Sequence, residues 1–292
     1  MHVFTIRDIE NLTAIKAHTL RIWEQRYGLL KPARKTGNHR LYSNDDLKQM
    51  LKIATLYRNG YKISKIAALT PEQVSRQALD TYIIQDPFQL YAHHLTEAAI
   101  DLDGPKFEKI IDGCILQYGF EKTLFQILYP FLHKVGLLWV TGNVVPAMEH
   151  FASCIIMRKL CVALNGVEVN SQENNAVVLL FTPEHERHEI PILAMQYLLK
   201  KNGIKAVSLG QHVTVKILAD YCTTHAVTHL YTHIITYLRR YDIDKYIAEL
   251  SAKFYNKQIV VSGAMVQDLQ RSFLNVRILK TDEEMIAFSR KL

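Results

Sequence analysis

The pattern of apolar residues changes twice along the 292-residue chain, which restricts the fold to three successive kinds of structure. Residues 1–72 carry short amphipathic segments, and residues 73–87 are polar without a clear period, as in a linker. Residues 88–170 carry four longer helical patterns joined by short loops, typical of an antiparallel four-helix bundle. Residues 171–292 alternate strand and helix patterns. The sequence therefore predicts a multidomain chain, α followed by α/β.

The first segment has the pattern of a winged helix-turn-helix. Helices are expected over residues 6–12 and 14–27, with a short break between them. Gly37-Asn38 predicts a tight turn between two basic extended arms, residues 31–35 and 39–42. Such a hairpin would form the wing.

The last segment predicts a doubly wound parallel sheet of five strands with helices between them, one of these near 265–273. Its first strand is a continuous apolar run, as expected for a strand buried on both faces. The expected strands are 176–181, 206–209, 227–236, 258–262 and 275–279.

Positive charge is concentrated in the first segment. The whole chain has 35 Lys and Arg against 28 Asp and Glu, a net charge of +7. Residues 1–70 alone hold 13 basic and 5 acidic residues, whereas the remainder holds 22 and 23. This concentration favours a domain that binds the phosphate backbone of nucleic acid. An anionic membrane surface and plain solvation are the alternatives.

Other sequence features predict a cytoplasmic protein. We find no run of 18 apolar residues and no apolar core of a signal peptide near the N-terminus. The cysteines lack the spacing of a zinc site or a disulfide framework, so reduced and mostly buried thiols are expected. They are Cys114, Cys154, Cys161 and Cys222.

Three ordered motifs of the first segment resemble the MerR family of transcriptional regulators. They are Thr19 to Pro32, Asn38 to Ser43 and Asn59 to Ile66. The form Trp23-Glu24-Gln25-Arg26-Tyr27-Gly28 resembles the branch of that family that carries cobalamin-binding sensors. The resemblance implies binding to double-stranded operator DNA as a dimer or larger homo-oligomer, with RNA polymerase or another regulatory protein as a further partner. No sustained heptad follows Leu69, so assembly would come from the sensor region.

The resemblance places the second helix in the major groove and the wing over the flanking backbone or minor groove. Trp23 and Tyr27 fit either packing or DNA contact. Lys48, Lys52 and Arg58 are expected on a solvated helix face. The residues expected at DNA are Lys16, His18, Thr19, Arg21, Arg26 and Tyr27 on the helix, and Arg34, Lys35, His39, Arg40 and Tyr42 on the wing.

The segment from Val135 to His150 resembles the helical cap of cobalamin-binding proteins. The resemblance places Trp139, Glu149 and His150 over the upper face of the cofactor, whereas spacing alone fits a core tryptophan and a surface Glu-His pair. In photoreceptor relatives a histidine that follows the tryptophan ligates cobalt. Here that position is Val140, which argues against a light-driven exchange of the upper ligand.

The loop from Glu186 to Pro191 resembles the ExHxxG motif of cobalamin domains. The resemblance makes His188 the lower axial ligand of cobalt, oriented by Glu186. Pro191 replaces the glycine of the motif. The Leu209-Gly210 turn fits the family, Ser262-Gly263 stands for its Gly-Gly turn, and residues 231–233 stand for the Ser-rich strand end near the nucleotide tail.

These features predict a DNA-binding regulator, not an enzyme. We favour a repressor controlled by adenosylcobalamin or methylcobalamin and by oligomerisation through the C-terminal module. One alternative is a regulator that keeps the sensor fold only for protein contact. A second is a cobalamin-dependent enzyme or methyl carrier, which would lack a substrate-activating domain and leave the basic N-terminal segment unexplained.

We predict that DNA binding weakens steeply with salt, because each phosphate contact releases counterions. Fluorescence anisotropy titrations of a duplex at salt concentrations from about 50 to about 200 mM measure this effect. The affinity should fall roughly 10³-fold or more if six or more phosphates are contacted. An affinity independent of salt would contradict the prediction.

Overall fold

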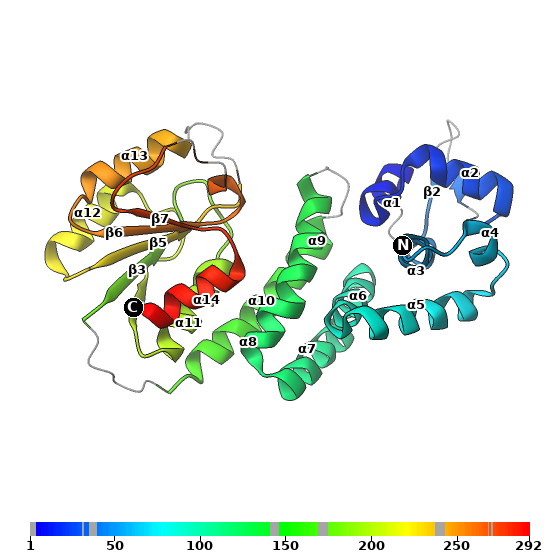
Figure 1. Cartoon of the computed structure of the whole chain (residues 1–292), viewed down its shortest axis with the longest axis horizontal. Helices are drawn as coiled ribbons and strands as arrows, with labels where there is room; N and C mark the ends of the chain where they lie inside the picture. Colours follow the sequence, from blue (N-terminus) through cyan, green and yellow to red (C-terminus); the bar gives the residue numbers. More distant parts are fainter. Residues whose placement is uncertain are drawn as a thin grey trace. The chain divides into compact units, whose positions relative to one another are not determined.

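A computed structural model describes residues 4–30, 32–34, 40–140, 146–168, 175–236, 243–267, 269 and 271–292, without the side chains of 34, 82–85, 137–140 and 146. The chain divides into two compact units, residues 1–155 and 156–292. Figure 1 labels their elements. In unit 1 these are α1 (Ile6–Thr13), α2 (Ala17–Tyr27), β1 (Ala33–Arg34), β2 (Arg40–Leu41), α3 (Asn44–Arg58), α4 (Ile63–Ile66), α5 (Pro71–Gln85), α6 (Pro87–Ile100), α7 (Gly104–Tyr118), α8 (Phe120–Thr123), η1 (Leu124–Leu128), α9 (Tyr129–Val140) and the first half of α10 (Pro146–Asn165). In unit 2 they are β3 (Val177–Phe181), α11 (Ile190–Lys201), β4 (Lys205–Ser208), α12 (Val215–Thr224), β5 (His229–His233), α13 (Ile243–Lys253), β6 (Gln258–Ser262), η2 (Ala264–Val266), β7 (Val276–Leu279) and α14 (Asp282–Lys291).

The winged helix-turn-helix forms as the sequence predicts. α1 starts at a capping box in which the Thr5 amide donates to Asp8 Oδ2 at 2.5 Å and the Asp8 amide donates to Thr5 Oγ1 at 3.3 Å. β1 and β2 pair antiparallel, and Phe4 pairs with Tyr42 beside them. Leu20 and Leu47 are among the buried apolar residues that join the helices. Local capping and the burial of apolar residues thus both stabilise the winged helix-turn-helix.

The expected linker over residues 73–87 is wrong, because α5 occupies most of it. The Thr70 amide donates to Gln73 Oε1 at 2.8 Å, and Pro71 takes the first position, where a missing N–H costs nothing. Val74 and Ala78 are each 1% exposed, and α5 packs along α3. Val74 and Ala78 are small and one turn apart, and they anchor the first part of this helix without giving a clear apolar period.

The N-terminal helix of the bundle, α6, is joined to α3 of the DNA-binding domain by ion pairs. Lys48 Nζ lies 2.6 Å from Asp101 Oδ2, and Lys52 Nζ lies 3.0 Å from Glu97 Oε1. Asn44 Nδ2 donates to the carbonyl of Ile100 at 3.1 Å. The partners on α3 are four residues apart, so they form one stripe on that helix. We call this contact the α3–α6 joint.

Lys48 and Lys52 therefore do not lie on a solvated face as expected. Burial alone would lower the pKa of Lys48, but Asp101 and Asp45 outweigh it and raise that pKa. Burial would raise the pKa of Glu97, but His93 and Lys52 outweigh it and hold that pKa at about 2. Arg58 is paired as well, because its guanidinium donates to the carbonyl of Thr13. The sequence could not reveal these pairs, because the acids lie about 50 residues further along the chain.

The helices of the bundle pack through aromatic rings. Phe107 of α7 lies edge-on to Phe131 of α9 at 5.4 Å and to Phe151 of α10 at 5.6 Å between ring centroids. The third helical segment is continuous from α8 to α9, but its middle part, η1, is a π-helix. α9 also packs on α1, and burial together with Arg58 lowers the pKa of Lys134 on α9 to about 8. Among the described residues, α6 and α9 of the bundle thus both contact the DNA-binding domain.

The α/β unit is the expected doubly wound sheet. Its five strands are all parallel in the order β4-β3-β5-β6-β7. α12 and α13 cover one face, where Leu179 and Phe181 are buried, and α11 and α14 cover the other, where Val178 and Leu180 are buried (Figure 1). The helix expected near 265–273 is only a short 3₁₀ turn, η2. The carboxyl ends of the strands meet at one edge, where parallel sheets place their sites.

Two further expectations concern the thiols and membranes. All four cysteines are free, but only Cys114 is buried, while Cys154 and Cys161 on α10 are exposed. The prediction of mostly buried thiols is therefore wrong, because α10 turns both cysteines outward. No helix in the described part of the chain is long and apolar enough to cross a membrane.

We predict that Glu97→Gln lowers the free energy of unfolding of unit 1 by about 1–3 kcal/mol, because it removes a charged acceptor from Lys52 and His93. The measurement is urea unfolding followed by tryptophan fluorescence, since both tryptophans, Trp23 and Trp139, lie in this unit. Asp45→Asn is the matched control, because the Asp45 side chain is 94% exposed and its pair with Lys48 is a surface pair. Equal effects of the two substitutions on the free energy of unfolding would contradict a stabilising role of the α3–α6 joint.

Candidate DNA-binding surface and cofactor site

The second helix, α2, presents a basic face. Lys16, His18, Arg21 and Arg26 are exposed, and Thr19 is half-buried beside the ring of His18. Lys16 Nζ lies 3.5 Å from Glu10 Oε1, but its side chain is 75% exposed. These positions are accessible to a partner, and their contact with base edges or phosphates stays a prediction.

The wing differs from its expectation at two residues. Arg40 Nε donates to both carboxylate oxygens of Glu24, at 3.1 and 2.9 Å, so the wing is tied to α2. Tyr42 is 1% exposed, with its hydroxyl 3.5 Å from Glu24 Oε2, and burial together with Glu24 raises its pKa to about 12. Tyr42 is therefore a core residue and not a DNA contact. Lys35, His39 and the side chain of Arg34 lie outside the described residues.

The two aromatic residues of α2 have different places. Trp23 is 5% exposed and its ring lies edge-on to Tyr57 at 4.9 Å, so it packs in the core. Tyr27 is half-buried, with the guanidinium of Arg26 5.6 Å from its ring centroid. Arg26 thus has an aromatic support that limits its motion.

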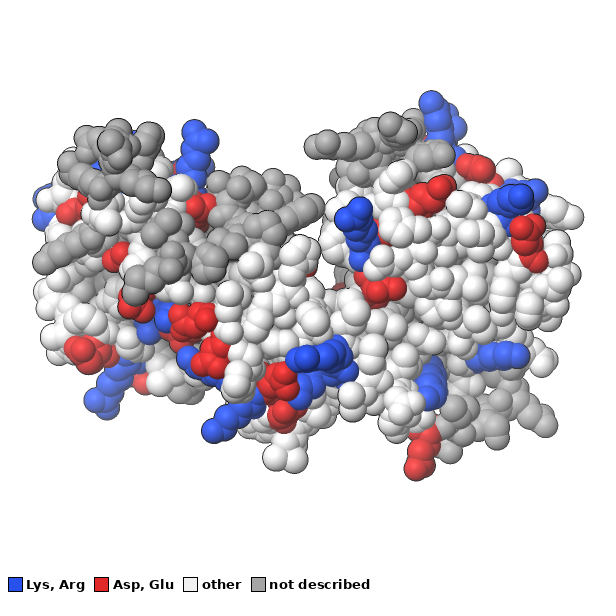
Figure 2. All heavy atoms as spheres, turned by 180° about the vertical axis from the view of Figure 1, so that it is seen from behind, with Lys and Arg blue, Asp and Glu red and all other residues white. Residues whose placement is uncertain are grey.

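On the face of the molecule in Figure 2, Lys and Arg side chains lie beside Asp and Glu side chains, without a large field of one sign. This distribution agrees with the pairing of Lys48, Lys52 and Arg40 with acids. Part of the positive charge of the N-terminal segment is therefore neutralised within the protein. The exposed cations Arg21 and Arg26 of α2 remain available for phosphates.

In the α/β unit, the buried carboxylate of Glu186 joins the loops after β3 and β5. It is fully buried. Oε1 accepts from the amides of Arg187 and His188 at 2.9 and 3.0 Å, and Oε2 accepts from the amides of Ile235 and Thr236 at 2.8 and 2.9 Å. Burial would raise its pKa, but these hydrogen bonds and His188 hold it at about 2. Glu186 is therefore a charged anchor for both loops.

Glu186 also orients His188. His188 Nδ1 lies 2.5 Å from Glu186 Oε1, and its side chain is 36% exposed. A carboxylate acceptor assigns the ring proton to Nδ1 and leaves Nε2 with a lone pair. A neutral imidazole held in this way fits the lower axial position of a cobalamin cobalt. Glu186 and His188 are thus the residues that would hold the metal.

Two glycines of the family motifs are replaced in this chain, one by Pro191 and one by Ser262, and the structure shows what each replacement requires. Pro191 lies in the first turn of α11, where a missing N–H is not needed. Gly210 has a φ of 74°, a conformation that favours glycine. Gly263 has a φ of 103°, and a Cβ there would lie 2.3 Å from the carbonyl oxygen of Ile234. The turn after β6 therefore requires glycine at its second position only.

The serine at the first position of that turn takes part in a buried polar chain. The Tyr231 hydroxyl lies 2.7 Å from Ser262 Oγ, which lies 2.8 Å from His233 Nδ1. Tyr231 is fully buried and its ring stacks on Phe288. Burial lowers the pKa of His233 to about 4, so its ring is neutral near pH 7. At the strand end expected near a nucleotide tail, large side chains therefore fill the space.

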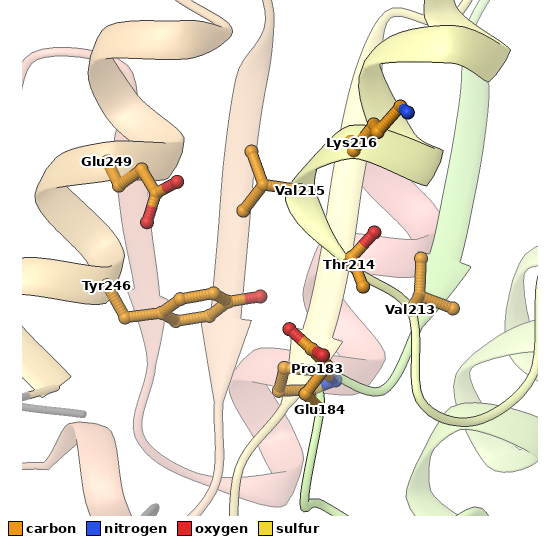
Figure 3. Close-up of a pocket in the computed structure, with 8 residues that line it drawn as sticks. All are labelled: Pro183, Glu184, Val213, Thr214, Val215, Lys216, Tyr246 and Glu249. Carbon is orange, nitrogen blue, oxygen red and sulfur yellow. The ribbon is translucent and has the colours of Figure 1, made fainter. Parts of the chain in front are cut away.

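A cavity of about 230 Å³ lies on the α12–α13 side of the strand ends (Figure 3). In Figure 3 the Tyr246 hydroxyl points toward the loop of Pro183 and Glu184. Lys216 and Glu249 also line it. Its size and mixed charges suit a small polar group. Sequence patterns gave no signal for it, because its residues come from three separated segments.

The expected cap residues are only partly described. Trp139 lies in α9, and its side chain is outside the described part. Glu149 accepts from Ser153 Oγ at 2.7 Å, and His150, 77% exposed, has Nδ1 3.2 Å from Glu149 Oε2. Within unit 1 the last two form a surface pair on α10, so their role at a cofactor stays a prediction.

Comparison with known proteins agrees with both parts of the chain. Residues 4–73 match the MerR HTH family of regulatory proteins, and residues 91–162 match the B12 binding domain family. The HTH-type transcriptional repressor CarH of Myxococcus xanthus is 26% identical over 221 residues, covering 74% of this chain and 73% of that protein. The HTH-type transcriptional regulator MlrA of Escherichia coli is 41% identical over 69 residues, covering 24% of this chain and 28% of that protein.

A solved structure extends the likeness in fold. The monomethylamine corrinoid protein of Methanosarcina barkeri has a TM-score of 0.55 and 11% identity, covering 68% of this chain and 95% of that one. The fold and the matched families together define a DNA-binding transcriptional regulator with a cobalamin-type sensor module. These matches support a MerR-family regulator with a B12-binding module.

We predict that the α/β unit loses stability as the pH falls from 6.5 toward 4. The unfolded chain protonates His233 in this range and the folded chain does not, so the stability present above pH 6.5 falls by roughly 1 kcal/mol per pH unit. The measurement is hydrogen-exchange protection of β5, corrected for the intrinsic effect of pH on exchange. His233→Asn should flatten this dependence, whereas the exposed control His212→Asn should not. An unchanged slope in His233→Asn would refute the assignment.

Proposed function

We propose that this regulator is a repressor whose DNA binding is controlled by cobalamin at the C-terminal unit. The single observation that carries the proposal is the Glu186–His188 pair at the strand ends of a chain that begins with a winged helix-turn-helix. The relative CarH is named a transcriptional repressor, which supports the sign of regulation. Bound cobalamin would supply a coloured cobalt centre with exchangeable axial ligands, and His188 Nε2 would face it.

A route for control runs through the α3–α6 joint. The DNA-binding domain and most of the bundle form one compact unit, so a shift of α6 moves α3. α9 provides a second route, because it packs on α1 and leads toward Trp139. A shift of α9 would therefore change the position of α1, which packs on α2.

The partners follow from the same proposal. Double-stranded operator DNA binds α2 and the wing, with Lys16, His18, Thr19, Arg21, Arg26 and Arg40 as the described contact residues. A homo-oligomer forms through the sensor region, and RNA polymerase or another regulatory protein is a further partner. The protein acts in the cytoplasm and has no catalytic activity.

A specific observation favours a second candidate function, a regulator that does not bind cobalamin. The Tyr231–Ser262–His233 chain fills the strand end expected near the nucleotide tail. In that case the sensor fold serves protein contact only. The two candidates differ in whether the purified protein takes up the cofactor.

The test is the visible spectrum of the purified full chain after addition of adenosylcobalamin or methylcobalamin and removal of the unbound cofactor. We expect a coloured complex that His188→Ala abolishes and that Glu186→Gln weakens about 10- to 100-fold, the usual effect of removing the group that orients a metal-bound histidine. His225→Ala, at an exposed position after α12, should bind as the unmodified chain does. A colourless protein would reject the proposal and support the second candidate. Illumination of the complex followed by a DNA-binding titration tests light as the signal.

A further inference from the structure

One apolar side chain interrupts the exposed face of α2. Ile22 is 51% exposed, although its neighbour Trp23 is 5% exposed and Leu20 is 2% exposed. The apolar pattern of the sequence groups these residues together, but the structure turns Ile22 outward. About half of the Ile22 side chain is left in water, so that half gains nothing from burial in the fold and is open to a partner.

Ile22 lies at the centre of a single helical stripe. The exposed residues His18, Arg21, Gln25 and Arg26 stand four and one positions before it and three and four after it. This is the spacing of one helix face. Every other side chain on the stripe is cationic or a hydrogen-bonding group.

The residues around Ile22 indicate which kind of molecule contacts this face of α2. Arg21 and Arg26 flank it, so a hydrophobic protein surface placed there would bury two charges without partners. Duplex DNA offers phosphates to the arginines and one apolar group at base edges of the major groove, the 5-methyl group of thymine. The charges and the apolar centre therefore match DNA with a thymine at this point.

We propose that Ile22 contacts a thymine methyl group and so contributes to the choice of operator sequence. The inference rests on α2 being the helix that enters the major groove. Ile22 adds discrimination, whereas the flanking cations add affinity that is largely independent of sequence.

The experiment first selects preferred duplexes from a random library with the full-length protein. Each thymine of the selected site is then replaced in turn by deoxyuridine, which keeps the base pairing and removes only the methyl group. We expect one position in each half-site where this replacement weakens binding by about fourfold, the worth of one buried apolar carbon. In Ile22→Ala the same replacement should have no effect.

Leu116→Ala is the matched control, because Leu116 is an apolar residue of α7 with 91% exposure. It should retain the full effect of deoxyuridine, and circular dichroism should show both variants folded. Specific binding that is insensitive to every deoxyuridine, or an effect that persists in Ile22→Ala, would overturn the role of Ile22 alone. Failure to select any duplex would overturn DNA binding through α2, and the role of Ile22 with it.

Discussion

The buried carboxylate of Glu186 is the interaction on which the sensor end of the sheet depends. A charge in that position is costly unless it is fully hydrogen-bonded. Amides from two loops and the ring of His188 satisfy it, so the loops after β3 and β5 are fixed relative to each other. A neutral side chain at this position would leave several donors without an acceptor. The same bonds set the tautomer of His188, so structural support and metal-binding capacity have one origin.

The strand end beside this anchor shows a different balance. Tyr231 and His233 share the hydroxyl of Ser262, and His233 stays neutral there near pH 7 because burial lowers its pKa. Gly263 is retained because the backbone of Ile234 leaves no room for a Cβ. The axial position thus keeps the chemistry of a cobalamin site, whereas the neighbouring strand end is occupied by protein side chains. The two sites therefore differ in their side chains, although both lie at the carboxyl ends of the same sheet.

In the N-terminal unit, charge serves two separate purposes. Lys48 and Lys52 neutralise acids of α6 and hold the bundle against the DNA-binding domain. Arg21 and Arg26 stay exposed on α2. Removing a lysine of the first group would loosen the domain contact, whereas removing an arginine of the second would weaken phosphate contacts. Net charge alone could not separate these groups, because both lie within the first 70 residues.

The sequence determined the order of domains, the sheet and most of the axial motif. Apolar periodicity and local signals such as the Thr5 and Ser43 capping boxes depend on neighbours in the chain, so a pattern can reveal them. The helix over residues 71–85, the burial of Tyr42 and the outward position of Ile22 were decided by tertiary packing. Tertiary packing also decided the α3–α6 joint, in which Lys52 and Glu97 are 45 residues apart. It likewise decided the Tyr231–Ser262–His233 chain, in which Tyr231 and Ser262 are 31 residues apart. Such contacts depend on where distant segments meet, and that meeting is set by the fold as a whole.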